Sequence, residues 1–276
     1  LTFSISNRFG NLKLTHRHRL LILLGLVKKI SEKKELTDLE KAEWERVVNR
    51  FDQVCRKAHS LDVALLIDGE ESWMQDAADD LVEEMMLKYN KKKAVVFNTL
   101  QMYRWDRLPY LKELHKRAQE KGFKVGVKVV RGAYMEKENE RAQEKGYPTP
   151  ICESKFATDA NFDETVAYTI THLDIISIFS GTHNEESCYK LIELLEKNGI
   201  AKNNPSVWFG QLYGMSDHIS FNLASNGYNV AKYLPFGPVR DVMPYLIRRA
   251  EENTSVAGQT TRELSLLKQE RKRRKI

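Results

Sequence analysis

Short apolar runs alternate with long amphipathic stretches along most of this chain, and this alternation is the feature that most constrains its fold. The runs are rich in β-branched residues and occupy positions 63–67, 94–97, 125–130, 175–179, 207–209 and 230–234. Short apolar segments of this kind are typical of parallel strands that are covered on both faces. The sequence therefore predicts a buried parallel sheet.

Amphipathic stretches between these runs predict the helices that would cover such a sheet. They occupy positions 72–88, 110–121, 162–172, 185–198 and 218–226, and Asn198-Gly199 and Asn226-Gly227 resemble helix ends. Strand-then-helix units in continuous order, with no linker, predict an α/β fold of the (β/α)8 TIM-like barrel type rather than two domains. A doubly wound sheet is the alternative, but no GxGxxG follows any predicted strand.

Composition sets outer limits on the class of protein. The chain has 276 residues, of which 42% are hydrophobic, so it is large enough for one substantial core. Its longest wholly apolar stretch covers only residues 20–24, far short of the ~20 residues that a membrane span requires. Cys55, Cys152 and Cys188 lack metal-ligand or CxxC spacing, which favours free thiols in a reducing compartment. We expect a soluble or peripheral protein.

The net charge of +6 is concentrated near residues 13–19 and in the terminal segment 268–275. A basic tail can bind nucleic acid or anionic headgroups, but more often it is a solvated helix end. The tail contains no aromatic residue on which a base could stack, so no nucleic-acid partner is expected.

Polar side chains follow most of the predicted strands at their carboxyl ends. In a barrel these ends meet on one face, where active sites are built. The residues concerned are Asp68, Asn98, Lys128, Arg131, Tyr134, His183, Asn184, Gln211 and Tyr233. Taken singly, each has a structural explanation: Asp68 as a helix cap, Tyr134 as a core ring, His183 as a hydrogen-bonded core histidine. Their recurrence at the same end of successive strands favours a functional site.

Adjacent arginines in the last third of the chain are a second candidate feature. Consecutive helical residues project about 100° apart, so Arg248 and Arg249 reach one anion only if their helix lies across a pocket. The planar guanidinium suits a carboxylate ligand. Alternatively, Glu252 pairs with either arginine on an exposed helix surface.

A series of motifs carries a family resemblance over about residues 60–265. In order, they are Asp68-Gly-Glu-Glu, Val130-Arg-Gly-Ala-Tyr134, Thr182-His-Asn184, Phe209-Gly-Gln-Leu-Tyr-Gly-Met215, Tyr233-x-Pro-x-Gly237 and Tyr245-Leu-x-Arg-Arg249. This series resembles the monofunctional branch of the proline dehydrogenase family.

The resemblance implies a distorted (β/α)8 barrel that holds FAD noncovalently. Such an enzyme oxidises L-proline to 1-pyrroline-5-carboxylate by hydride transfer from C5 to flavin N5, passes the electrons to a membrane quinone and needs no metal. It implies peripheral association with the cytoplasmic face of a bacterial membrane, or a mitochondrial inner-membrane or matrix location in a eukaryote. We expect a mostly helical segment at 1–60, a flavin-binding catalytic barrel at 61–265 and a basic tail at 266–276.

The resemblance also implies roles for individual residues. Substrate contacts fall to Arg248, Arg249, Tyr233, Leu212 and Asp68, and the residues closest to the chemistry are Lys128, Asp68 and Tyr233, with Lys128 near flavin N5. The implied flavin contacts are Asn98, Lys128, Val130, Gly132, Ala133, Tyr134, Lys155, Thr182, His183, Asn184, Gln211 and Glu252.

One departure and two alternatives accompany this interpretation. The family's first strand ends in a lysine that contacts the substrate carboxylate, whereas this sequence opens at Leu1-Thr2, as though truncated after that lysine. Hydroxyproline is the alternative substrate, and the bulk of Tyr233 argues against it. The alternative of another class is a flavin-free binding barrel with a basic tail.

Overall fold

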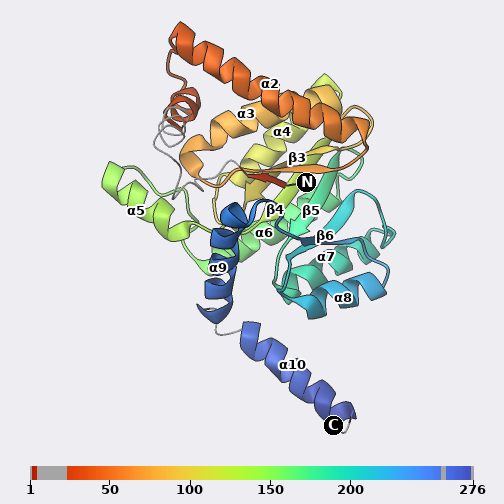
Figure 1. Cartoon of the computed structure of the whole chain (residues 1–276). Helices are drawn as coiled ribbons and strands as arrows, with labels where there is room; N and C mark the ends of the chain where they lie inside the picture. Colours follow the sequence, from red (N-terminus) through yellow and green to blue (C-terminus); the bar gives the residue numbers. More distant parts are fainter. Residues whose placement is uncertain (1, 5–23, 256–258, 275–276) are drawn as a thin grey trace. The chain divides into compact units, whose positions relative to one another are not determined.

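The computed structural model describes residues 2–4, 24–255 and 259–274, with the side chains of 2–4, 241, 248, 251–255 and 259–263 left out of the description. Backbone contacts divide the chain into two compact units, Leu1–Ser180 and Gly181–Ile276, which are described in turn. Figure 1 labels most of the elements of both.

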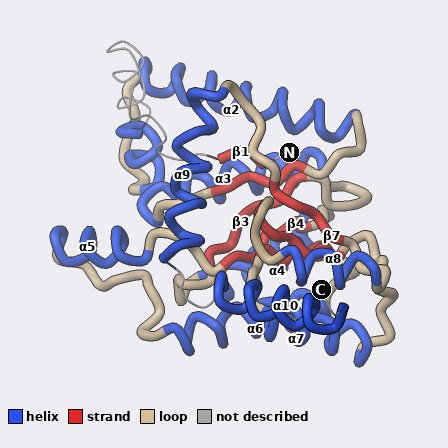
Figure 2. The backbone as a smooth tube through the Cα atoms, turned by 60° about the horizontal axis from the view of Figure 1, so that its bottom comes forward, coloured by secondary structure: helices blue, strands red, loops and turns tan. Residues whose placement is uncertain are grey.

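Parallel strands in chain order form the first unit. They are β1 (Thr2–Ser4), β2 (Leu65–Asp68), β3 (Val96–Gln101), β4 (Val125–Val130) and β5 (Ile176–Gly181), and each pairs in parallel with the next. The helices between them are α3 (Ser72–Tyr89), α4 (Arg107–Lys121), α5 (Met135–Lys145) and α6 (Lys155–Ile170). Figure 2 distinguishes the strands from the helices that follow them.

Side-chain alternation along these strands separates two faces. Ile67, Asn98, Val127 and Ile178 are register partners across β2 to β5, so they share one face, and all are buried. This face lies against the helix layer, where α3 packs on β3. Residues one position along each strand, such as Thr99, point to the opposite face.

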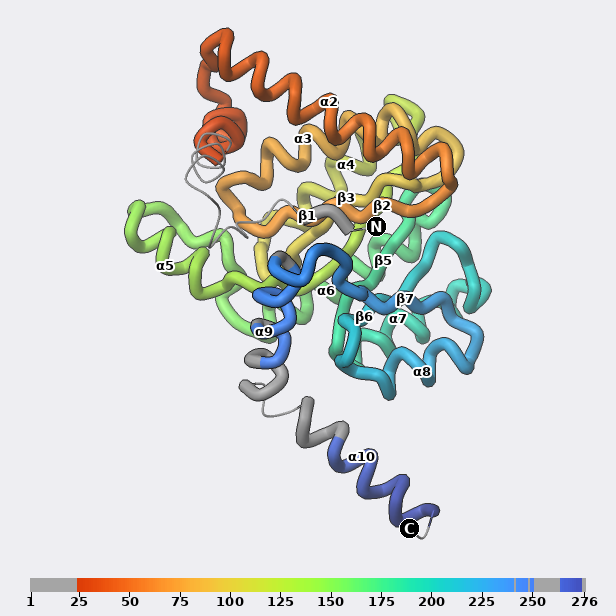
Figure 3. The backbone as a smooth tube through the Cα atoms, in the orientation of Figure 1, coloured from red at the N-terminus to blue at the C-terminus, as the bar shows by residue number. Residues whose placement is uncertain are grey.

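Helical residues precede β2 as well. Residues 24–31 are helical, and Val27 forms an apolar cluster with Met74 and Ala77 of α3. The next helix, α2 (Asp38–Ser60), begins at a capping box formed by Thr37 and Glu40, and Figures 1 and 3 show it alongside α3.

In the described part of the second unit there are two parallel strands and four helices. They are β6 (Val207–Leu212), β7 (Val230–Tyr233), α7 (Glu185–Lys197), α8 (Asp217–Ser225), α9 (Val239–Ser255) and α10 (Gln259–Arg274). At the start of this unit, the Thr182 amide donates to the Gly210 carbonyl of β6 at 3.1 Å.

The predicted fold class is confirmed by this order of elements. Neighbouring strands of the first unit follow one another without the reversal that marks a doubly wound sheet. Each predicted helix has a counterpart among α3, α4, α6, α7 and α8. Helix α5 was not predicted, because its face toward the protein buries only Glu138 and Ala142 and so lacks an apolar stripe. No helix in the described ranges is both long and apolar enough to span a bilayer.

Replacing Gly132 by alanine tests a close contact in the loop after β4. Gly132 has φ +116°, and a Cβ there would lie 2.5 Å from the ring of Tyr103, which is buried. We expect the variant to lose roughly 2–4 kcal/mol of unfolding free energy, combining backbone strain with overpacking. Gly146→Ala is the control, since its φ is +69° but no atom lies within 4 Å, and it should cost about 1 kcal/mol. Urea unfolding of both variants makes the comparison, and equal losses would contradict the Tyr103 contact.

Candidate active site

An ion pair at the carboxyl ends of β2 and β4 is the centre of the candidate site in the first unit. Lys128 Nζ lies 2.6 Å from Asp68 Oδ1, and each side chain is only 16% exposed. The Thr99 hydroxyl lies 2.7 Å from the same Asp68 oxygen and 2.8 Å from the Ile67 carbonyl, so its one proton is shared between two acceptors. We call Asp68, Thr99 and Lys128 the Asp68 cluster.

Register explains why these three residues meet. Thr99 is the partner of Lys128 across β3 and β4, so both point to the face opposite the helix layer. Asp68 ends β2 one residue beyond Ile67, which belongs to the helix-facing set, so Asp68 also points away from the helices. The predicted convergence of Asp68 and Lys128 is therefore present in the structure.

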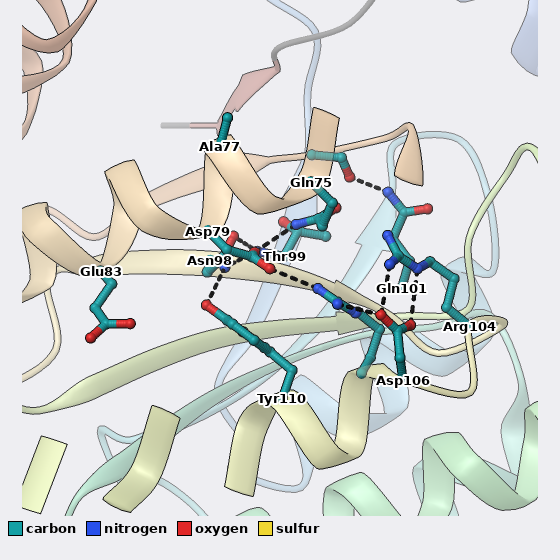
Figure 4. Close-up of polar contacts among 12 residues, drawn as sticks. Gln75, Ala77, Asp79, Glu83, Asn98, Thr99, Gln101, Arg104, Asp106 and Tyr110 are labelled. Atoms are coloured by element: carbon teal, nitrogen blue, oxygen red, sulfur yellow. Dashed lines mark hydrogen bonds and ion pairs between the residues drawn. The ribbon is translucent and has the colours of Figure 1, made fainter. Parts of the chain in front are cut away.

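Asn98 occupies a different environment from the one that the sequence suggested. Its amide donates to Asp79 Oδ1 of α3 at 2.7 Å, its side-chain oxygen accepts from the Thr99 amide at 2.9 Å, and the residue is 1% exposed. Figure 4 shows Asn98 reaching toward Asp79 and Tyr110 on the helix side of β3. The assignment of Asn98 to the pyrimidine edge of a flavin is therefore not supported by its orientation.

Gln101 is the residue of β3 that sequence reasoning missed. It lies two positions after Thr99, on the same face as the Asp68 cluster. Its amide donates to the Gly69 carbonyl, directly after Asp68, whereas its buried Oε1 has no hydrogen-bond partner among the described residues. The period-two alternation from Thr99 to Gln101 is the sequence signal that identifies it.

The segment after β4 is held by backbone and side-chain contacts. The Val130 carbonyl accepts from the Met102 amide at 2.7 Å, Gly132 packs on the Tyr103 ring, and Ala133 is exposed. Tyr134 donates to Glu70 Oε2 at 2.9 Å, so this segment is tied to the loop that follows Asp68.

Arg131 and Lys155 meet at one carboxylate. Arg131 Nε and Lys155 Nζ each lie 2.6 Å from an oxygen of Asp159 in α6, and the Arg131 guanidinium lies 4.4 Å from the centre of the Phe162 ring. Partial burial alone would raise the pKa of Asp159, but the hydrogen bonds from Lys155 and Arg131 hold that pKa below its usual value. This cation pair is suited to an anionic ligand group.

In the second unit, several predicted residues serve the local backbone. Asn184 caps α7 by accepting from the Ser187 amide at 3.2 Å, and its own amide donates to the Thr182 hydroxyl. The Gln211 side chain donates to the Thr182 carbonyl at 3.2 Å and accepts from Ser220 of α8 at 2.9 Å. These bonds order the loop after β5 and the end of β6.

His183 is a neutral imidazole in a cationic environment. Its Nδ1 lies 3.0 Å from the Ser216 hydroxyl, and Ser216 itself has a left-handed backbone with φ +51°. Burial, followed by the charges of Lys232 and Arg249, lowers the pKa of His183 to about 4. At neutral pH this side chain therefore carries no charge and acts as a hydrogen-bonding group.

Apolar and aromatic side chains gather at the end of β7 and on α9. Leu212 and Tyr233 are register partners and lie side by side on one face of β6 and β7. The Tyr233 and Tyr245 rings are 5.6 Å apart at 62°, and the Arg249 guanidinium lies 5.2 Å from the centre of the Tyr245 ring. We call Leu212, Tyr233, Tyr245 and Arg249 the Tyr245 cluster. Sequence reasoning missed Tyr245 as the partner of Arg249, although their i,i+4 spacing on a helix was visible.

Two residues of the predicted substrate and cofactor set lie outside the described side chains. These are Arg248 and Glu252, both within α9. The lysine expected before Leu1 is not part of the sequence, although Thr2–Ser4 do pair with β2 as a first strand.

Comparison with known proteins identifies the family. A family model described as proline dehydrogenase matches residues 6–262. The chain belongs to the proline dehydrogenase family. It is 38% identical over 234 residues to human mitochondrial proline dehydrogenase 1, a match that covers 84% of this chain and 39% of the relative.

Two further proteins extend this comparison. The carbapenem antibiotics biosynthesis protein CarD of Pectobacterium carotovorum is 38% identical over 246 residues, covering 89% of this chain and 63% of CarD. Proline utilization A from Bdellovibrio bacteriovorus, solved after inactivation by N-propargylglycine, superposes with a TM-score of 0.71 at 27% identity over 77% of this chain and 22% of that one. The chain thus spans less than two thirds of the length of these relatives.

The low pKa of His183 predicts a loss of stability in mild acid. Its folded-state pKa of about 4 lies below the ordinary value of 6.5, so the unfolded chain takes up a proton first as the pH falls. The stability contribution is complete above pH 6.5 and is lost as the pH falls from 6.5 through 4, by up to about 3 kcal/mol. His183→Asn should flatten this part of the curve of unfolding free energy against pH. His59→Asn, at an exposed site on α2, is the control and should leave the curve unchanged.

Proposed function

We propose that this chain oxidises L-proline to 1-pyrroline-5-carboxylate with FAD as its cofactor and passes the electrons to a quinone. The observation that carries the proposal is the Asp68 cluster, a cation and a carboxylate 2.6 Å apart at the carboxyl ends of two strands, in a member of the proline dehydrogenase family. We assign the catalytic function to residues 61–265, and no catalytic role to the basic tail at 266–276.

The residues of the first unit fit a flavin. The buried Gln101 Oε1, which has no partner among the described residues, is a hydrogen-bond acceptor that suits the N–H of a flavin pyrimidine ring. Lys128 supplies a cation on the same face. Arg131 and Lys155 supply two more cations, which suit an anionic group of the cofactor such as a phosphate. We therefore propose Gln101 in place of Asn98 as the flavin-contacting residue of β3.

Lys128 is proposed to stabilise negative charge beside the electron-accepting ring. FAD, when bound, takes up the two electrons removed from proline. Asp68 holds the Lys128 ammonium in one direction, and Thr99 holds Asp68. A charge fixed in advance stabilises developing charge without reorganisation, which is the main electrostatic contribution of an enzyme site.

The Tyr245 cluster is proposed to bind proline. Leu212 and Tyr233 present adjacent apolar surfaces, suited to the methylenes of a pyrrolidine ring. Arg249 is half-buried and oriented by the Tyr245 ring, so its guanidinium is suited to a carboxylate partner. Arg248 is proposed as the second cation for the same carboxylate, as the family resemblance implies.

Quinone transfer and peripheral membrane association are proposed on family grounds. Several relatives carry "mitochondrial" in their names, so a mitochondrial location is proposed if the source is eukaryotic. Arg273 and Arg274 of α10 pair with Glu270 within one helix, which is the behaviour of a solvated helix end.

The visible spectrum of the purified protein tests the proposal as a whole. We expect a flavin spectrum that bleaches when proline is added anaerobically. A colourless protein that binds no added FAD would instead support the alternative of a flavin-free barrel.

Lys128→Met tests the proposed electrostatic role. The variant should lower the midpoint potential of the bound flavin, because reduced flavin loses a stabilising charge, and kcat/KM for proline should fall about 10²–10³-fold. Lys124→Met, at the position just before the start of the same strand, is the matched control. An unchanged midpoint potential with intact flavin binding would show that Lys128 does not lie beside the flavin ring.

Tyr233→Ser tests the substrate pocket. A 4-hydroxyl against the Tyr233 ring would be buried without a partner, at roughly 1–3 kcal/mol, so the wild-type chain should prefer proline by about tenfold to hundredfold. The variant should shift the ratio of kcat/KM values toward trans-4-hydroxyproline. Tyr213→Ser, at an exposed tyrosine beside Leu212, should leave the ratio unchanged. A ratio that stays the same in Tyr233→Ser would place the ring outside the pocket.

A further inference from the structure

A buried ionic network lies behind the Asp68 cluster, on the helix side of β3. Asp79 of α3 and Arg107 of α4 form a 2.7 Å ion pair and are 3% and 4% exposed. The Asp79 carboxylate also accepts from the amides of Gln75 and Asn98, each at 2.7 Å. We call Gln75, Asp79, Asn98 and Arg107 the Asp79 network (Figure 4).

We propose that Asp79 is a positioning residue for Asp68 and acts through the Asp79 network. The expected effect of Asp79 on proline oxidation rests on the proposed function, whereas its expected effect on the backbone around Asp68 does not. Two separate connections lead from the Asp79 carboxylate to the turn at Asp68-Gly69.

The first connection runs through Gln75. Its amide nitrogen is held by Asp79, and its side-chain oxygen would lie 2.9 Å from a Cβ at position 69. The Gln75 amide therefore lies against the Gly69 backbone, and a larger residue at position 69 would displace it. The Gly69 carbonyl also accepts from Gln101, so Gly69 packs against a side chain of α3 and is hydrogen-bonded to one of β3.

The second connection runs through Asn98. Its amide group is oriented by Asp79, which leaves its side-chain oxygen to accept from the Thr99 amide at 2.9 Å. The Thr99 hydroxyl then reaches Asp68 Oδ1 at 2.7 Å. Asp79 is thus joined to Asp68 through Asn98 and Thr99, across the thickness of β3.

The cost of burying the Asp79 carboxylate favours a positioning role for this residue over a purely stabilising one. Burial raises the pKa of Asp79, while Arg107, Gln75 and Asn98 oppose that rise, so the burial of this carboxylate is costly. Buried ion pairs can often be replaced by apolar residues of similar size without loss of stability. What such residues cannot replace is the acceptor that orients Gln75 and Asn98.

Asp79→Asn in the FAD-loaded protein is the first test. One carboxylate oxygen accepts from Gln75 and Asn98 and the other from Arg107, so an amide places a donor against a donor in either orientation. We expect amide hydrogen exchange over residues 66–71, measured by mass spectrometry, to become at least tenfold faster. We expect kcat for proline to fall about tenfold to hundredfold, as a small displacement of a catalytic group does.

Glu83→Gln is the matched control. Glu83 lies one turn further along the same face of α3 and also pairs with an arginine of α4, Arg117, at 2.7 Å. It has no bond to β3 among the contacts described, so exchange over 66–71 and kcat should stay at wild-type values. If Glu83→Gln accelerated exchange over 66–71 as much as Asp79→Asn did, loss of any α3–α4 ion pair would be the cause and the proposal would fail.

Asp79→Leu/Arg107→Met separates positioning from folding. The double variant removes both charges together, and Asp106, the other partner of Arg107, keeps its ion pair with Arg104, so no buried charge is left unpaired. The amides of Gln75 and Asn98 lose their acceptor, so we expect a cooperative unfolding transition at a lowered melting temperature. Exchange over residues 66–71 should nevertheless remain fast. Recovery of wild-type exchange in this variant would show that the network serves stability alone and would overturn the proposal. Hydrogen exchange is measured without proline oxidation. If the chain did not oxidise proline, the proposed function would be refuted, but the exchange measurement would still decide whether Asp79 positions Asp68.

Discussion

The Asp68–Lys128 ion pair is the interaction on which the rest of the first unit depends. Strands β2 and β4 are not neighbours, because β3 lies between them. Adjacent strands are ~4.8 Å apart, so the pair must span about twice that distance, which the long lysine side chain allows. The β3 residue that lies between Asp68 and Lys128 must be small, and it must donate a hydrogen bond to the carboxylate. Thr99 meets both requirements, and its hydroxyl lies at Asp68 Oδ1.

Much of the fold could be predicted from the sequence, because buried parallel strands and amphipathic helices leave strong periodic signals. The site residues could be predicted only where the apolar run ends at the same residue as the strand itself. The apolar run before Asn98 stops at Phe97, so Asn98 appeared to be the first polar residue beyond the strand. In the structure β3 continues to Gln101, since Asn98 and Thr99 have their polar groups satisfied inside the protein. Because the strand was predicted to end too early, the flavin contact was assigned to Asn98, whose side chain faces the helices.

The same error has a counterpart in β6. The apolar run there ends at Phe209, whereas the strand extends to Leu212. Gln211 consequently lies toward Ser220 of α8, and Leu212 points to the face that it shares with Tyr233. Polar residues inside strands are invisible to a hydrophobicity pattern, because the bonds that permit their burial come from distant segments. For Arg249, the structure describes a neighbour that charge pairing did not suggest: Tyr245, an aromatic ring four residues earlier.

Distant pairing also explains why the Asp79 network could not be predicted. Asp79 and Arg107 are 28 residues apart, and neither belongs to a recognisable motif. Each would be read as surface charge, yet both are buried between α3, β3 and α4. A polar group such as Asn98 can be buried in a strand only if the helix layer supplies its partner. Once Asp79 fulfils that need, it in turn requires a cation, and Arg107 provides it. The buried charges behind the sheet therefore follow from the polar residues within it, and those residues are the ones that orient Thr99 and Gly69 beside Asp68.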